Sequence, residues 1–360
     1  MLNVFKGWVD RYFSDEEALI FLLLLISCFA IIIGFGAVLA PVFIAIIMAY
    51  LLQGGMNYCK SKGLGNRVST LIMFSIFISI FLSLLFIVIP ATITQAGQLF
   101  YELPKMLAQG QGLLMLLPER YPELITEIQV KEWIGQAGKE LALLGQWALS
   151  FSLNSIPGAI TILIYLVLVP ILVFFFLKDS GVITRFLLSF LPRDRKLMNT
   201  IWAEMEVQIA NYIRGKVVEI VIVGGVTYVG FVIFDLRYAE LLAILVGLSV
   251  LIPYIGAAVV TVPIAVVAYF QFGYGETLFY CMLVYGIIQA LDGNVLVPLL
   301  FSEVVNLHPV AIIVAVLAFG GIWGFWGVFF AIPLATLLKA VLTAWPQAVK
   351  KTDQQQSLCE

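Results

Sequence analysis

Long apolar runs without charged side chains dominate the hydrophobic pattern of this chain. Residues 18–59 carry no charge, and about 20 helical residues span the hydrocarbon core of a bilayer. Strand-like alternation is absent from the runs, and a segment in lipid must satisfy its backbone polar groups internally. We therefore predict transmembrane helices. The further runs cover 68–89, 155–177, 217–234, 241–275, 277–302 and 304–338.

Composition argues against a soluble domain. Hydrophobic residues make up 62% of the 360 positions and charged residues 12%, whereas soluble domains are about 45–50% apolar. The exterior of a soluble protein must meet water, but lipid can surround apolar outer faces. The formal net charge is −2 and no block of Lys and Arg occurs, so nucleic acid is not an expected partner. The sequence predicts an all-α, polytopic membrane protein with about eight transmembrane segments, surrounded by membrane lipid.

Sequence motifs for covalent chemistry are missing. There is no GxxxxGK[ST] phosphate loop and, with a single histidine, no HExxH metal motif. None of the four cysteines forms a CxxC pair, so we predict neither a disulfide framework nor a metal site. We expect no enzymatic activity and no cofactor.

Charges between the runs predict the orientation. The loop with Lys60, Lys62 and Arg67 has no acidic residue, which places it in the cytoplasm by the positive-inside rule. Segment 178–216 has seven basic and four acidic residues and suits the same side, whereas 91–154 has four basic and six acidic residues and suits the opposite side. We expect a multi-pass protein of the bacterial inner membrane with both termini cytoplasmic.

The apolar runs and the charged loops between them divide the chain into six segments. The first apolar run is expected to be an anchor rather than a cleaved leader. Its Gly34, Gly36 and Pro41 predict a hairpin of helices 18–33 and 37–53, with one long kinked helix as the alternative. The segments are membrane helices (1–90), an extracytoplasmic segment (91–154) with an amphipathic stripe of Trp133, Ala137, Leu141, Leu144 and Trp147, a transmembrane helix (155–177), a cytoplasmic helical segment (178–216), a transport core (217–345) and a cytoplasmic tail (346–360).

Two similar runs in the C-terminal half suggest an internal repeat. Ala243-Ile-Leu-Val is followed by Pro253, Gly256 and Pro263; Ala311-Ile-Ile-Val is followed by Gly321, Gly324 and Pro333. Either each run is one kinked crossing, or 239–272 and 308–340 are re-entrant hairpins that follow crossings at 217–234 and 277–300. Inverted repeats with broken helices indicate the binding region of a transporter.

Asp292 is the strongest candidate for a solute, proton or cation site. It lies inside an apolar run, with Gln289 one turn before it and Asn294 just after it. A charge at the bilayer centre costs about 2.5–3.5 kcal/mol on insertion scales, so it usually faces a partner or a wet cavity. The alternative is that Asp-Gly-Asn forms a turn or helix end near the interface.

The proline and glycine breaks are the next candidates. Pro253 removes an amide donor, and glycine permits close backbone approach. Carbonyls freed at the breaks could coordinate a cation or a polar solute, or the small residues could serve tight helix packing. The remaining candidates of this kind are Gly256, Gly321, Gly324 and Pro333.

The other polar residues have structural interpretations. Arg214, Lys216 and Glu219 are predicted as charges at the membrane boundary, with Glu219 paired or snorkelling and ion coupling as its alternative role. His308, followed by Pro309, is expected to start the last helical unit, with proton handling as the alternative.

Several stretches resemble one known family. They are Leu251-Ile-Pro-Tyr-Ile-Gly256, Ala290-Leu-Asp-Gly-Asn294 with Pro298, Asn306-Leu-His-Pro309, and Gly320-Gly-Ile-Trp-Gly-Phe-Trp-Gly327 with Ala331-Ile-Pro333. The chain is similar here to the autoinducer-2 exporter family. The resemblance implies an inner-membrane protein of about eight helices, export or exchange of a small solute, and a homo-oligomeric, pentameric assembly. It also implies H⁺ or Na⁺ as candidate coupling ions, because members are linked to autoinducer-2 export or to sodium/proton antiport.

Together these features predict a secondary transporter that exports or exchanges a small solute. Two alternatives remain. A membrane scaffold could bind partners through 91–154, and a channel would offer a continuous water-filled path.

Overall fold

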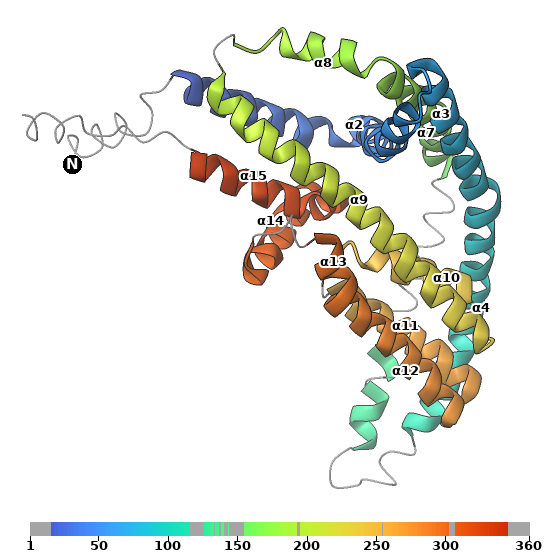
Figure 1. Ribbon diagram of the computed structural model, residues 1–360. Coiled ribbons are helices and arrows are strands. Elements are labelled where there is room, and N and C mark those ends of the chain that lie inside the picture. Colours follow the sequence, from blue (N-terminus) through green and yellow to red (C-terminus); the bar gives the residue numbers. More distant parts are fainter. Residues whose placement is uncertain are drawn as a thin grey trace, which may run out of the picture.

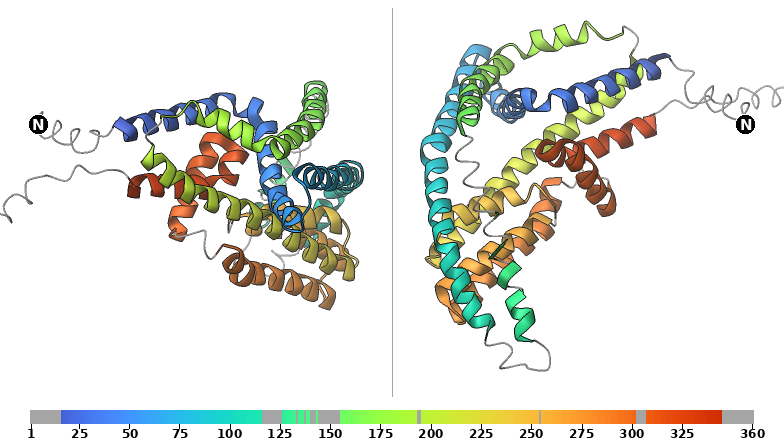
Figure 2. Two further views of the ribbon diagram at one scale, coloured as in Figure 1. Left: turned by 45° about the horizontal axis from the view of Figure 1, so that its top comes forward. Right: turned by 180° about the vertical axis from the view of Figure 1, so that it is seen from behind.

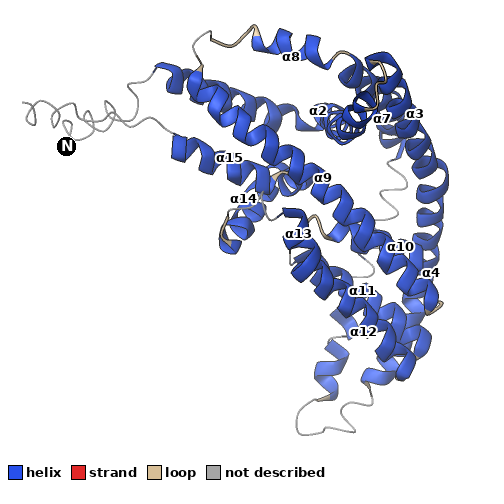
Figure 3. Cartoon of the chain, viewed as in Figure 1, coloured by secondary structure: helices blue, strands red, loops and turns tan. Residues whose placement is uncertain are grey.

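The computed structural model describes residues 16–115, 126–132, 134–136, 138–139, 143, 155–192, 195–253, 255–301 and 307–344. Within these residues the chain is helical and has no strand (Figure 3). Eight stretches of helix are long and apolar enough to cross a membrane. The predicted all-α, polytopic fold is confirmed.

Three helices form the N-terminal bundle. They are α2 (Glu16–Ser61), α3 (Asn66–Ser83) and α7 (Ser155–Lys178), followed by the short α8 (Ser180–Leu188). Their shared core contains Met56, Phe77, Val173 and Leu177. The predicted hairpin within 18–53 is absent, because α2 stays helical through Pro41 and bends instead (Figure 1). The alternative, one kinked helix, describes this part of the chain.

One long helical rod joins the bundle to the rest of the molecule. Helix α3 continues through a π-helical turn, η1 (Leu84–Val88), into α4 (Ile89–Leu114), so the predicted boundary at residue 90 lies inside a helix. Pro90 has no amide to bond the carbonyl four residues back, and the wider turn before it lets the helix continue. The rod runs along one side of the molecule (Figure 2). The Trp133–Trp147 stripe lies outside the described residues, as do residues 1–15 and 345–360.

Helix α9 (Lys196–Ile233) is the central element of the C-terminal half. Its 38 residues measure about 57 Å at 1.5 Å per residue. It therefore merges the predicted cytoplasmic segment before residue 217 with the predicted crossing after it. Helix α9 packs against α2, α10, α12 and α15.

The first broken unit follows α9 directly. We call α10 (Ala239–Ser249), the turn after it and α11 (Ile255–Phe272) the first hairpin. A Cβ atom added to Gly256 would collide with the Ser249 carbonyl oxygen. In a continuous helix two residues seven apart are about 10 Å apart along the axis. The chain must therefore reverse here, and only glycine leaves room for the approach.

The second broken unit repeats this arrangement. It follows a crossing made of α12 (Glu276–Leu291), the π-helical turn η2 (Asp292–Leu296) and α13 (Val297–Phe301). We call α14 (Pro309–Phe329) and α15 (Ala331–Ala344) the second hairpin. Gly324 lies inside α14 with a φ of 59°, and a Cβ atom on Gly327 would collide with the Phe319 carbonyl. Both similar runs are therefore broken near their predicted Pro and Gly positions, and the chain reverses direction at each break.

Two smaller features support this description. His308 is the N-cap of α14 and accepts a hydrogen bond from the Val310 amide at 3.3 Å, as its position before Pro309 predicts. Ile252, in the turn of the first hairpin, packs against Ala315 and Ala331 of the second. The two hairpins therefore meet near their breaks.

The close approach at each break predicts which glycines tolerate a methyl group. Gly256→Ala or Gly327→Ala places Cβ against backbone, which no side-chain rotation can relieve. We expect each to lower the free energy of unfolding by about 1–3 kcal/mol or more. Gly321→Ala is the matched control, because its Cβ would meet nothing within 4 Å. Thermal unfolding in detergent measures all three; equal stability of G256A and G321A would contradict the reversal.

Candidate functional site

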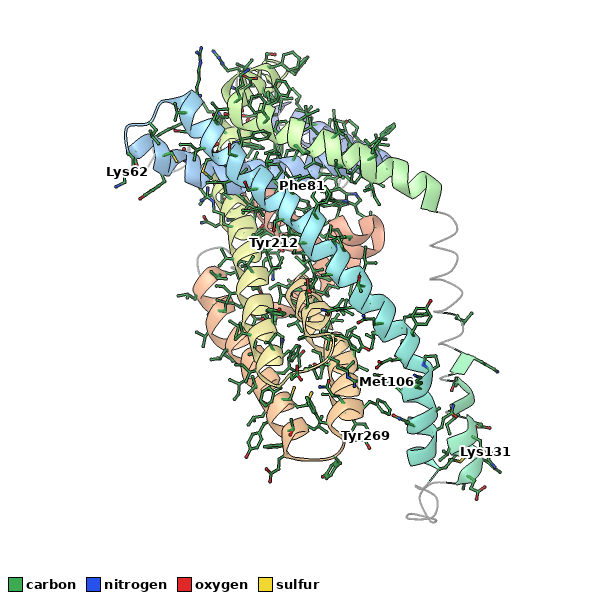
Figure 4. The ribbon with its side chains drawn as sticks, turned by 90° about the vertical axis from the view of Figure 1, so that its right-hand side faces the viewer. Lys62, Phe81, Met106, Lys131, Tyr212 and Tyr269 are labelled. Atoms are coloured by element: carbon green, nitrogen blue, oxygen red, sulfur yellow. The ribbon has the colours of Figure 1, made fainter. Side chains whose placement is uncertain are left out.

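A cavity of about 540 Å³ lies where α9, both hairpins and the crossing α12–η2–α13 meet. Most of its wall is aliphatic, with prolines and Phe301. Figure 4 places Tyr212, which lines it, between the end of the molecule that carries Lys62 and the end that carries Lys131 and Tyr269. The cavity therefore lies between the two ends of the molecule, away from both. Its polar lining residues are Tyr212, Lys216, Glu219, Ser249, Gln289 and Asp292.

An ion pair on α9 faces the cavity. Lys216 Nζ lies 2.8 Å from Glu219 Oε2, and their side chains are only 5% and 2% exposed. The ammonium also donates a hydrogen bond to the Val250 carbonyl at 2.8 Å and lies 5.3 Å from the centre of the Phe301 ring. A lysine and a glutamate three residues apart share one helix face, so the pair enters the apolar interior with little net charge.

Tyr212 makes the corresponding contact with the second hairpin. Its hydroxyl donates a hydrogen bond of 2.9 Å to the Phe329 carbonyl, at the end of α14. Lys216 bonds Val250, directly after the end of α10. Two side chains one turn apart on α9 therefore each satisfy a carbonyl beside one helix break.

Asp292 and Gln289 present polar atoms that neither a hydrogen bond nor an ion pair engages, whereas Glu219 Oε2 lacks a hydrogen bond but is ion-paired with Lys216. Asp292 Oδ1 and Gln289 Nε2 are buried and have no hydrogen-bond partner. The turn or helix end proposed as the alternative for Asp292 does not occur, because the helix passes through η2 and continues into α13. Pro298, which lacks an amide, follows η2 by two residues, just as Pro90 follows η1. The π-helical turn keeps the crossing continuous at Asp292.

Not every predicted residue reaches the cavity. Pro253, Gln289 and Asp292 line it, whereas Gly256, Gly321, Gly324 and Pro333 do not. Gly256 and Gly324 shape the breaks instead. Asn294 is exposed and donates a hydrogen bond of 2.8 Å to the Ala290 carbonyl of its own helix. Asn294 therefore does not line the cavity beside Asp292.

The three charged residues predicted at the membrane boundary also differ in whether they reach the cavity. Arg214 is exposed, as expected, but Lys216 and Glu219 are buried at the cavity. The pairing predicted for Glu219 is found, with Lys216 as its partner, and this mutual pairing makes their burial tolerable. Tyr212 and Ser249 were not predicted as site residues. A signal for Tyr212 existed, since positions 212, 216 and 219 follow the spacing of one helix face.

The fold and the cavity define a multi-pass membrane protein with a charged internal site beside two broken helical hairpins. The sequence profile of the AI-2E family transporter matches residues 19–347, and the chain belongs to this family. It is 48% identical over 346 residues to "Putative permease PerM" of Escherichia coli K12, covering 96% of this chain and 98% of that protein. "Putative transport protein YueF" of Bacillus subtilis is 26% identical, covering 83% and 82% of the two chains. The chain is thus a transport-family protein, a class that is not enzymatic.

The buried ion pair predicts a strong effect on stability. Lys216→Met leaves Glu219 buried without its cation, and we expect the free energy of unfolding to fall by about 3–5 kcal/mol. The double variant K216M/E219Q removes both charges and should recover a large part of that loss.

A second ion pair provides the control. Arg237 and Glu102 lie 3.5 Å apart with side chains 62% and 38% exposed, so R237M should cost less than about 1 kcal/mol. Thermal unfolding of the purified variants in detergent compares them. Equal losses for K216M and R237M would contradict the burial of the Lys216 pair.

Proposed function

We propose that this chain is a secondary transporter that carries a small polar solute through the cavity beside the two hairpins. The observation that carries the proposal is the pair of unpartnered buried atoms, Asp292 Oδ1 and Gln289 Nε2, in a largely apolar cavity. Buried polar atoms are normally hydrogen-bonded, and exceptions often mark a site whose ligand is absent. Membership in a transporter family supports the same conclusion.

The polar atoms suggest the class of solute. Glu219 is paired with Lys216, so Asp292 supplies the charge that no ion pair neutralises within the lining. A ligand that satisfies both free atoms needs a donor or a cationic group for the carboxylate and an acceptor for the amide. We propose a small solute with both kinds of group, carried in exchange with H⁺ or Na⁺ at Asp292.

Orientation and assembly complete the proposal. We place the protein in the bacterial inner membrane with both termini in the cytoplasm, on the basis of the basic loop at Lys60, Lys62 and Arg67. Export rather than uptake, and a homo-oligomeric, pentameric assembly, rest on the family resemblance.

The test is the flux of ions and solutes across the membrane of proteoliposomes that contain the purified protein. A sodium gradient is imposed and proton movement is followed with a pH-sensitive dye, while a loaded mixture of amines, amino acids and polyols is followed by mass spectrometry. In D292N the solute loses an interaction with a charged group worth about 1.5–3 kcal/mol. Because the solute no longer binds the Asp292 carboxylate, we expect ion-dependent flux to fall about tenfold or more.

Asn294→Ala is the matched control, because the Asn294 side chain is exposed and bonds only its own helix among the described contacts. It should keep the flux of the unmodified protein. Unchanged flux and unchanged ion dependence in D292N would remove Asp292 from the mechanism. Flux that rises linearly with solute and never saturates would favour a channel.

A further inference from the structure

Helix α9 holds the two hairpins by two chemically different bonds. Tyr212 donates from a neutral hydroxyl to the Phe329 carbonyl of the second hairpin. Lys216 donates from an ammonium to the Val250 carbonyl of the first hairpin. The hydroxyl has one hydrogen to donate, whereas the ammonium has three and is attracted to every carboxylate near it. The two hairpins therefore differ in how their bonds respond to charge in the cavity.

Lys216 divides its donors between unequal acceptors. Glu219 Oε2 and the Val250 oxygen each lie 2.8 Å from Nζ. The contact with Glu219 joins two opposite charges, which attract each other more strongly than an ammonium attracts a neutral carbonyl. If the ammonium is drawn elsewhere in the cavity, the bond to Val250 is the one that breaks first.

Asp292 is the group that can draw it. Asp292 lines the same cavity as Lys216, and its Oδ1 has no partner. Glu219 lines this cavity as well, and an ammonium placed between two carboxylates is attracted by both. When a proton, a cation or a solute donor neutralises Asp292, this attraction disappears.

The other groups around the ammonium do not compete. Tyr212 and Ser249 are neutral, and each donates to a backbone carbonyl, Ser249 to that of Val246 at 2.8 Å. Helices α14 and α15 contribute only aliphatic side chains to the lining of the cavity in the described part of the chain. Charge at this position is therefore decided by Lys216, Glu219 and Asp292.

We infer that Lys216 is a positioning residue that couples the occupancy of Asp292 to the first hairpin. With Asp292 neutralised by a proton, a cation or a solute donor, Lys216 stays on Glu219 and Val250, the arrangement seen in the structure, and holds the hairpin turn against α9. With Asp292 ionised and empty, Lys216 moves towards it and releases the Val250 carbonyl. The second hairpin, held by Tyr212, does not respond. The role of this coupling in transport rests on the proposed function.

Hydrogen–deuterium exchange of the full chain in nanodiscs tests the coupling without any transport measurement. The first-hairpin peptide covers 248–256, whose amides include that of Gly256 bonded to the Ile252 carbonyl. The second-hairpin peptide covers 326–334, whose amides include that of Leu334 bonded to the Phe330 carbonyl. Asp292→Asn mimics the neutralised carboxylate. It should slow exchange in the first peptide about threefold by reducing local opening and leave the second unchanged.

Two further variants locate the effect. K216M/E219Q removes both charges of the buried pair and should speed exchange in the first peptide about tenfold, through loss of a hydrogen bond from a charged donor. Adding D292N to it should then change nothing. Y212F should speed exchange in the second peptide only.

The inference is overturned if D292N changes both peptides alike, or if it still slows the first peptide in the K216M/E219Q background. It is also overturned if K216M/E219Q leaves the first peptide unchanged. The flux assay and the hydrogen-exchange assay test the proposed function and the coupling independently. Loss of the exchange pattern with flux intact would remove the coupling alone, and absence of flux with the pattern intact would remove the proposed function alone.

Discussion

The hydrogen bonds from α9 to the main chain beside the two helix breaks are the interactions on which the C-terminal half depends. A broken helix leaves carbonyls without partners, and in an apolar surrounding each costs several kcal/mol. Tyr212 and Lys216 satisfy two of them, at Phe329 and Val250. Glycine then lets the chain that follows each break lie directly against a backbone carbonyl that precedes the break. Gly256 lies against the Ser249 carbonyl, and Gly327 lies against the Phe319 carbonyl. The breaks are stable because a continuous neighbouring helix provides the donors that water would provide elsewhere.

The same arrangement explains why charged side chains occur in this interior. A lone lysine reaching Val250 would carry an unpaired charge into an apolar site, which is far less favourable than a neutral pair. Glu219 provides the counter-charge from the same helix face, 2.8 Å from the ammonium. Asp292 is therefore the carboxylate left over after the structural pairing is complete. Its Oδ1 is left without a partner in the cavity.

Much of this architecture could be predicted from the sequence, because apolar run length and helix breakers act locally. The runs predicted the crossings, and the repeated Pro and Gly positions predicted the two broken units. The continuity of α3 with α4 could not be read in the same way, because the π-helical turn before Pro90 removes the expected break. The bend of α2 could likewise not be told from a hairpin, since Gly34, Gly36 and Pro41 are compatible with both.

The site was less predictable because it depends on which face of a helix points inward. Asp292 and Asn294 are neighbours in sequence, and a turn would have placed them together. On a helix, residues two apart point about 200° away from each other, and Asn294 is exposed accordingly. Lys216 and Glu219 were placed at the boundary because their position along the chain suggested it. Their burial follows from the packing of α9 against the hairpins, which no local pattern contains.

The asymmetry between the two hairpins bears on how a repeated structure could work as a transporter. A ligand shifts a conformational equilibrium only by the difference in its affinity for the two states. If both hairpins were held by neutral hydroxyls, charge in the cavity would act on neither bond. If both were held by ammonium groups, it would act on both together. Under the proposed coupling, one bond of each kind gives two similar elements different responses to the same occupant.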